Sequence, residues 1–155
     1  GVGDNSYRFT VPAPLVEVVD GDTVALEFDA STDLARLTGR GQAQRIRLVG
    51  VNAAEVNTAQ ADYYAQQGVE PPWDQQTRML TEILNHATTV DFVVFDTERF
   101  PTIQQVEGDE VRWLMVLYVD GVPLWDDGVF SFDAPTGAGI GGAGVPLDLY
   151  ERLTG

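Results

Sequence analysis

The stretch Arg45–Val56, RIRLVGVNAAEV, decides the fold of this chain. Basic and apolar residues alternate at its start, which is the period-two pattern of a half-buried strand. The strand then runs into a polar corner, Asn-Ala-Ala-Glu, that ends at Glu55. Arg47 on the strand and the carboxylate that follows it could form one half of a phosphate site. We expect the other half to come from Asp22 upstream and Arg112 downstream.

The composition limits the classes of protein to which this chain can belong. Its 155 residues, of which 44% are hydrophobic, predict one globular domain over residues 1–155. The absence of Cys excludes a disulfide framework and a thiolate metal site. No apolar run reaches the roughly 18 residues that a membrane span needs, so we expect no membrane association.

The charge is strongly acidic, with 24 Asp and Glu against 9 basic residues, all of them Arg. A net charge of -15 favours solubility and repels nucleic acid at low salt. One explanation is a high-GC genome that favours Arg codons. The explanation that we favour is salt adaptation, because the composition resembles proteins of haloarchaea and their viruses. At about 1 M salt the Debye length is roughly 3 Å, which would screen the repulsion. The compartment stays open, although this composition favours a high-salt extracellular or virion-associated setting.

The hydrophobic pattern predicts five strands. The first two are joined by Asp20-Gly21-Asp22, and Asp-Gly between apolar runs favours a hairpin because Gly accepts a positive φ. Residues 1–13 end in Pro-Ala-Pro and predict an arm or a short edge strand. The five predicted strands are Leu15–Val19, Thr23–Phe28, Arg45–Val51, Val90–Phe95 and Val111–Val119.

One well-formed helix is predicted after the third strand, opened by Pro71-Pro72. Asn57–Glu70, before the helix, is predicted to be irregular, and residues 96–110, after the fourth strand, are predicted to be a connection. Beyond Trp125 the chain is rich in Gly and Pro and predicts loop, with a short closing helix near Leu147–Leu153. The buried stripe of the main helix is predicted at Trp73, Thr77, Leu80, Leu84 and Ala87.

Together these elements predict a mainly β fold with α (α+β). The most suitable architecture is a small five-stranded OB-fold-like barrel with one helix after the third strand. An all-β sandwich is the competing architecture, and the helix argues against it.

Four segments resemble, in order and spacing, the staphylococcal nuclease (thermonuclease-like) family. They are VVDGDTVAL (18–26), RLVGVNAAEV (47–56), TRMLTEIL (77–84) and RWLMVLYVDG (112–121). The family-like core covers residues 15–121, about two-thirds of the chain, and residues 122–155 form a divergent, Gly-rich C-terminal segment. The resemblance implies a calcium-dependent nuclease that hydrolyses DNA or RNA with little sequence preference.

The resemblance also implies a set of metal ligands. Asp22 would bind Ca²⁺ directly, with Asn52 beside it. The backbone carbonyl of Ala53 would complete the protein's share, and Glu55 would act through a water. Calcium takes about six to eight oxygens, so waters would fill the remaining positions.

The implied catalytic residues are Arg47, Glu55 and Arg112. Glu55 would position or deprotonate the attacking water. The two guanidinium groups would clamp the scissile phosphate and stabilise its developing charge, which a planar fork does in bidentate fashion. Tyr63 and Tyr64 are weaker candidates for stacking on bases of the substrate.

Other interpretations remain open. Taken singly, Asp22 could be an ordinary turn residue, and Arg47 and Arg112 could be solvated strand positions. Asn52 stands where the family has a second metal aspartate, and Ala54 stands where it has Pro. The change at Asn52, the acidic residues Asp109 and Glu110 before Arg112, and the lack of the family's C-terminal helix after Gly121 favour a rival. The rival is a weak or inactive nuclease-like barrel that serves as a structural or interaction module, for example in a virion or secreted assembly. Its protein partner would bind through the C-terminal segment. A single-strand-binding barrel fits less well, because it needs a basic groove.

Overall fold

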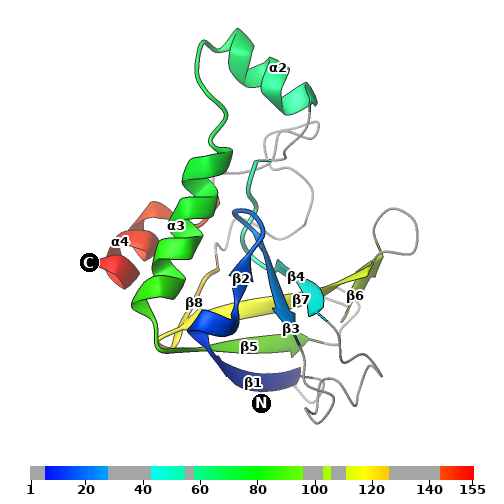
Figure 1. The fold of residues 1–155 in the computed structure, drawn as a ribbon, viewed down its shortest axis with the longest axis vertical. Helices are drawn as coiled ribbons and strands as arrows, with labels where there is room; N and C mark the ends of the chain where they lie inside the picture. The colour runs from blue at the N-terminus through cyan, green and yellow to red at the C-terminus, as the bar shows by residue number, and fades with distance from the viewer. Residues whose placement is uncertain (1–5, 28–42, 55–57, 96–102, 106–110, 126–143) are drawn as a thin grey trace.

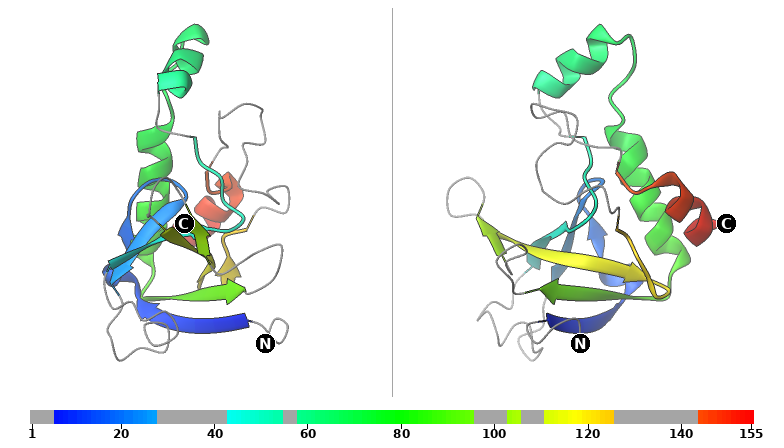
Figure 2. Two further views of the ribbon diagram at one scale, coloured as in Figure 1. Left: turned by 90° about the vertical axis from the view of Figure 1, so that its right-hand side faces the viewer. Right: turned by 180° about the vertical axis from the view of Figure 1, so that it is seen from behind.

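A computed structural model describes residues 6–27, 43–54, 58–95, 103–105, 111–125 and 144–155. In this part of the chain the strands form one curled sheet, a half-barrel, and helices lie to one side of it (Figure 1). The fold is therefore mixed α+β, as predicted. Two further views show the curl of the sheet and the projection of α2 (Thr58–Gln66) away from it (Figure 2).

The described residues contain eight strands, so the predicted number of five was wrong. The five predicted strands are present, but three short or edge strands join them. Along the sheet the order is β1-β5-β7-β4-β3-β2, and β6 and β8 both pair with β7. The strands are β1 (Ser6–Pro12), β2 (Glu17–Val18), β3 (Thr23–Glu27), β4 (Ala43–Leu48), β5 (Thr89–Phe95), β6 (Ile103–Gln105), β7 (Val111–Val119) and β8 (Val122–Pro123).

The length of β7 explains the additional short strands. On one side, β5 pairs with residues 115–119 of β7 and β6 pairs with residues 111–113. On the other side, β4 pairs in parallel with residues 113–115, and β8 pairs with residues 118–119. The short strands therefore satisfy backbone groups of β7 that its longer neighbours leave uncovered. The connection predicted over residues 96–110 thus contains a strand, whose three residues were too short to show a pattern.

The predicted turn between the first two predicted strands is confirmed. Val18 pairs with Val24 across the turn Asp20-Gly21-Asp22, which makes β2 and β3 a hairpin. At the end of β7, Asp120 and Gly121 have φ angles of 50° and 76°, as a tight turn between antiparallel strands requires. β1 pairs with β5 along its whole length, so the N-terminal segment contains an edge strand.

The described residues form three α-helices, where one well-formed helix and a short closing one were predicted. They are α2 (Thr58–Gln66), α3 (Trp73–His86) and α4 (Leu147–Thr154), with a 3₁₀ turn η1 (Ala13–Leu15) before β2. α3 begins directly after Pro71-Pro72, and α4 matches the predicted closing helix. The prediction of an irregular Asn57–Glu70 was wrong because α2 has no apolar stripe in TAQADYYAQ, although its Ala and Gln residues favour helix.

The core lies between the inner face of the sheet and α3. The helix buries Gln76, Leu80, Ile83 and Leu84, whereas Trp73 and Thr77 of the predicted stripe are only half-buried. On the other side of the helix, Tyr150 of α4 donates a hydrogen bond to the Glu82 carboxylate. The largest side chains that are fully buried are Phe92, Ile46, Leu48, Leu80, Ile83, Leu114, Met115, Leu117 and Leu124.

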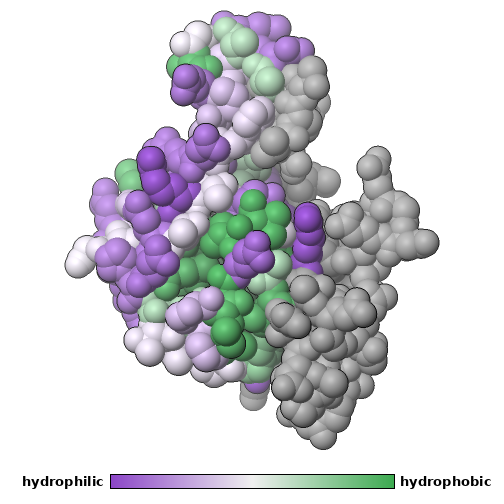
Figure 3. Space-filling view, in the orientation of Figure 1, coloured by the Kyte–Doolittle hydropathy of each residue, from purple (hydrophilic) through white to green (hydrophobic). Residues whose placement is uncertain are grey.

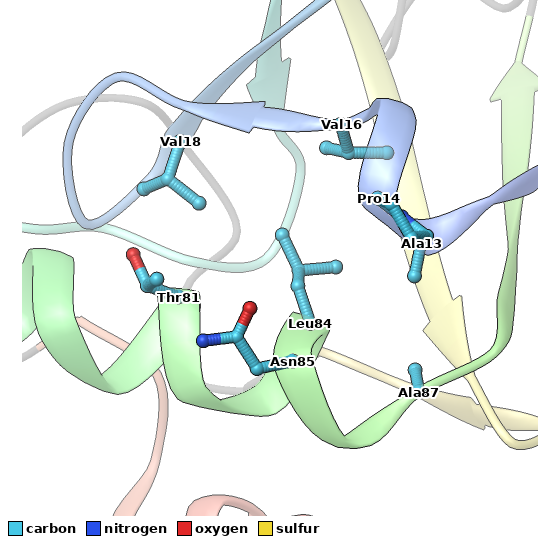
Figure 4. A pocket seen from close by; sticks show the side chains of 8 residues that line it. All are labelled: Ala13, Pro14, Val16, Val18, Thr81, Leu84, Asn85 and Ala87. Carbon is cyan, nitrogen blue, oxygen red and sulfur yellow. The ribbon is translucent and has the colours of Figure 1, made fainter.

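Apolar side chains also reach the surface between α3 and the segment η1–β2 (Figure 3). They line a groove of about 320 Å³ (Figure 4). One wall comes from Ala13, Pro14, Val16 and Val18, and the other comes from Thr81, Leu84, Asn85 and Ala87. Of the predicted site residues whose side chains the structure describes, none lines this groove.

Candidate functional site

Arg47 and the predicted metal ligands that the structure describes meet where the β2–β3 turn faces the end of β4. Thr23 pairs with Arg47 across β3 and β4. The Leu48 N–H then donates to the Asp22 carbonyl over 2.8 Å. This pairing brings Asp22 beside the corner Val49–Ala54, which we call the β4 corner.

Arg47 is buried, with 3% of its surface exposed, so its interpretation as a solvated strand residue was wrong. Its Nη1 donates to the carbonyl of Leu48 over 2.7 Å and also to the carbonyl of Val51. Its Nη2 donates to Asn52 Oδ1 over 3.2 Å. The guanidinium therefore holds the β4 corner closed and places a positive charge inside it.

Asp22 is more than a turn residue. Its Oδ2 accepts the Ala53 N–H over 2.8 Å and lies 3.3 Å from Arg47 Nη2. Its Oδ1 accepts the Thr23 hydroxyl over 3.0 Å. Asp22 is buried, with 6% of the residue exposed. Its side chain thus joins the turn to a corner that lies far along the sequence.

Burial raises the pKa of Asp22 from 3.8 to about 6, and this desolvation outweighs the Arg47 guanidinium, which lowers it. The neighbouring Asp20 adds to the increase, because its side-chain hydrogen bond and its negative charge both raise the pKa of Asp22. The ion pair therefore does not offset the cost of removing the carboxylate from water. The charge of this carboxyl group changes close to neutral pH.

Gln76 of α3 belongs to the site, although it was not among the residues predicted from the sequence. Its Oε1 accepts the Ala54 N–H over 2.9 Å. The turn packs closely here, since a Cβ added to Gly21 would lie 2.9 Å from the Cβ atoms of both Ala53 and Gln76. A Gln on the apolar side of an amphipathic helix was the signal that could have identified it.

The side chains of two catalytic candidates, Glu55 and Arg112, lie outside the part of the chain that the structure describes. Glu55 lies outside the described residues. Arg112 lies in β7, two residues before Leu114, and Leu114 pairs with Arg47. Its side chain lies outside the described part of the structure. The predicted roles of both residues therefore stay predictions.

The two tyrosines lie on α2. Their rings make an edge-to-face contact, with centroids 5.1 Å apart, and 38% of Tyr63 is exposed. Within the described residues, no hydrogen bond or ring contact joins Tyr63 or Tyr64 to the β4 corner. Their role in stacking on bases stays a prediction.

The β4 corner fits calcium in the kind of ligand but not in charge. It offers oxygen atoms from Asp22, Asn52 and the Ala53 backbone, and calcium prefers such oxygens. Asp22 is the one carboxylate among the predicted ligands that the structure describes, and Arg47 counters its charge. Elsewhere in the described ranges, too, no cluster of three His, Cys, Asp or Glu side chains could hold a metal ion. A bound calcium would therefore require Glu55 or waters as further ligands.

No protein-family model matches this chain, and no curated protein matches it. In the described part of the chain, every helix is too short or too polar to cross a membrane.

Proposed function

We propose that this chain is a calcium-dependent phosphodiesterase of the staphylococcal nuclease type, which hydrolyses DNA or RNA with little sequence preference. The corresponding fold is an OB-fold-like barrel. The curled sheet, the β2–β3 hairpin and the α3 helix that follows β4 in sequence support it.

One observation carries the proposal: Asp22 and the β4 corner converge on a buried guanidinium. The fold brings the turn residue Asp22 together with Arg47, Asn52 and the Ala53 backbone, although the turn and the β4 corner lie far apart in the sequence. These are the residues that the family resemblance assigns to the metal and to the phosphate. Apolar residues of similar volume often stabilise a protein as well as a buried ion pair or better, so an Arg buried beside a carboxylate whose pKa is raised is a candidate for a functional group.

The residues would act on a phosphodiester as follows. Arg47 supplies a fixed positive charge in a low-dielectric corner, where it can stabilise the negative charge that develops on the phosphate oxygens. Glu55, which follows the corner in sequence, orients or deprotonates the attacking water. Arg112 adds a second guanidinium. When bound, calcium would polarise the phosphate and neutralise part of its charge.

The rival function is a nuclease-like barrel without strong catalysis, used as a structural or interaction module. The observation that favours it is that Asn52 Oδ1 and both Asp22 oxygens already accept hydrogen bonds within the chain. It predicts no calcium binding and a partner that binds the C-terminal segment.

The test is digestion of single-stranded DNA at low salt and at about 1 M salt, where repulsion is screened. Each reaction is run with calcium and with a chelator. We expect calcium-dependent cleavage, and a loss of about 100-fold or more in Glu55→Ala, typical of a lost general base. Glu70→Ala removes an exposed acid and serves as the control. Absence of cleavage at every salt concentration, or full activity in Glu55→Ala, refutes the proposal.

A further inference from the structure

The side chain of Gln76 lies where three distant segments meet. Gln76 is buried, with 6% of the residue exposed. It accepts the Ala54 N–H, and its Cβ lies against the Asp20-Gly21-Asp22 turn. On a third side, a Cβ added to Gly144 would lie 3.2 Å from Gln76 Cγ. Gly144 in turn donates its N–H to the Asn52 carbonyl over 3.0 Å.

Hydrogen bonds determine the direction of the last two peptide groups in the β4 corner. The Ala53 N–H points to Asp22, and the Ala54 N–H points to Gln76. The described peptide bonds are all trans, so each carbonyl points opposite to the N–H that follows it. The Ala53 carbonyl therefore points away from Gln76. Gln76 therefore restrains the peptide group that carries the Ala53 carbonyl, and Asp22 restrains the preceding peptide group between Asn52 and Ala53.

We propose that Gln76 is a positioning residue for the Ala53 carbonyl, the predicted backbone ligand of the metal. The part of the inference that concerns a metal rests on the proposed function. The hydrogen bond from the Ala54 N–H explains why a polar residue occurs on the buried stripe of α3. An apolar side chain would fill the same space between Gly21 and Gly144 but would leave the Ala54 N–H buried without an acceptor.

The first experiment measures backbone amide exchange by NMR in the metal-free chain. Gln76→Met keeps the length of the side chain but removes the acceptor, and Gln76→Glu keeps an acceptor. Ile83→Val trims another buried residue of α3 and controls for general loss of stability. We expect exchange at Ala54 to become at least about tenfold faster in Gln76→Met, as the loss of a hydrogen bond predicts. Exchange in Gln76→Glu and in the control should remain close to that of the wild type.

The second experiment measures calcium binding by calorimetry in the same variants. We expect the Kd to rise about tenfold in Gln76→Met, as is common when a residue that orients a metal ligand is lost. It should change little in Ile83→Val. If Gln76→Met falls below its folding threshold, Gln76→Leu at lower temperature replaces it in both measurements.

The outcomes separate the two proposals. Wild-type exchange at Ala54 in Gln76→Met overturns the positioning role, and so does an unchanged calcium affinity in that variant. A wild-type chain that binds calcium but cleaves no DNA overturns the proposed function alone. A wild-type chain that binds no calcium overturns both.

Discussion

Replacing Asp22 by Asn should stabilise the protein increasingly as the pH rises. Asn keeps a side-chain oxygen that can accept the Ala53 N–H, but it carries no charge. In the native protein the pKa of Asp22 is raised from 3.8 to about 6, chiefly by burial. Below about pH 3.8 the carboxyl group is neutral in both the folded and the unfolded state, so it carries no penalty. Above about pH 6 the folded state must hold the ionised form, and the stability present at low pH is lost.

The magnitude follows from the two pKa values. The rise in the pKa of Asp22 from 3.8 to about 6 means that ionisation of this carboxyl group lowers the stability of the folded state by about 3 kcal/mol at neutral pH. Between about pH 4.5 and about pH 7.5, the gap in free energy of unfolding between Asp22→Asn and the wild type should therefore widen by about 2 kcal/mol. The ion pair with Arg47 forms only with the ionised carboxylate, so its contribution is already included in the pKa of about 6. Contributions that do not depend on pH, such as a difference in packing between the two side chains, cancel in this comparison.

The assay is urea unfolding followed by Trp fluorescence, at constant salt across this pH range. Asp62→Asn removes one negative charge from the exposed surface of α2 and is the matched control. If the curves of Asp22→Asn and the wild type stay parallel across the range, burial does not dominate the energetics of Asp22 and the reasoning is refuted.

Three further predictions concern the corner and the core. Arg47→Lys should lower cleavage by about 100-fold and the free energy of unfolding by about 1–3 kcal/mol, because one ammonium cannot replace a fork that bonds three acceptors; wild-type kcat would contradict it. Gly50→Ala should cost about 2–4 kcal/mol in urea unfolding, since Gly50 has a φ of 89° and its added Cβ would lie 2.5 Å from Trp125 Cε3; an unchanged midpoint would argue against the close packing. Leu80→Ala should cost about 2–5 kcal/mol by the same measurement, because Leu80 is fully buried; a cost below about 1 kcal/mol would be inconsistent with a core position.

The sequence predicts the elements whose signals are local and periodic. The Asp20-Gly21-Asp22 turn and the stripe of α3 depend on residues close together in the chain, and both are present. The β6 and β8 strands depend instead on uncovered edges of β7, which exist only after the sheet has formed. α2 has no apolar stripe, so the periodic pattern could not establish it.

In the candidate site, too, some features are visible in the sequence and others arise only in the folded chain. The spacing of Asp22, Arg47 and Asn52 is visible in the sequence, and the structure brings the three together. The burial of Arg47 is not visible, because a strand Arg is usually solvated and only the folded corner supplies its carbonyl acceptors. Gln76 was missed for a related reason: its place on the apolar side of α3 is visible in the sequence, but its contact with the Ala54 N–H is not.

The hydrogen bond from the Gly144 N–H to the Asn52 carbonyl has a consequence for synthesis of the chain. A ribosome releases the residues of the β4 corner long before it releases Gly144. Until then the Asn52 carbonyl and the side chain of Gln76 lack the neighbour that completes their packing. We therefore expect the corner to complete its packing only late in synthesis, since contacts between distant segments form only when both have emerged.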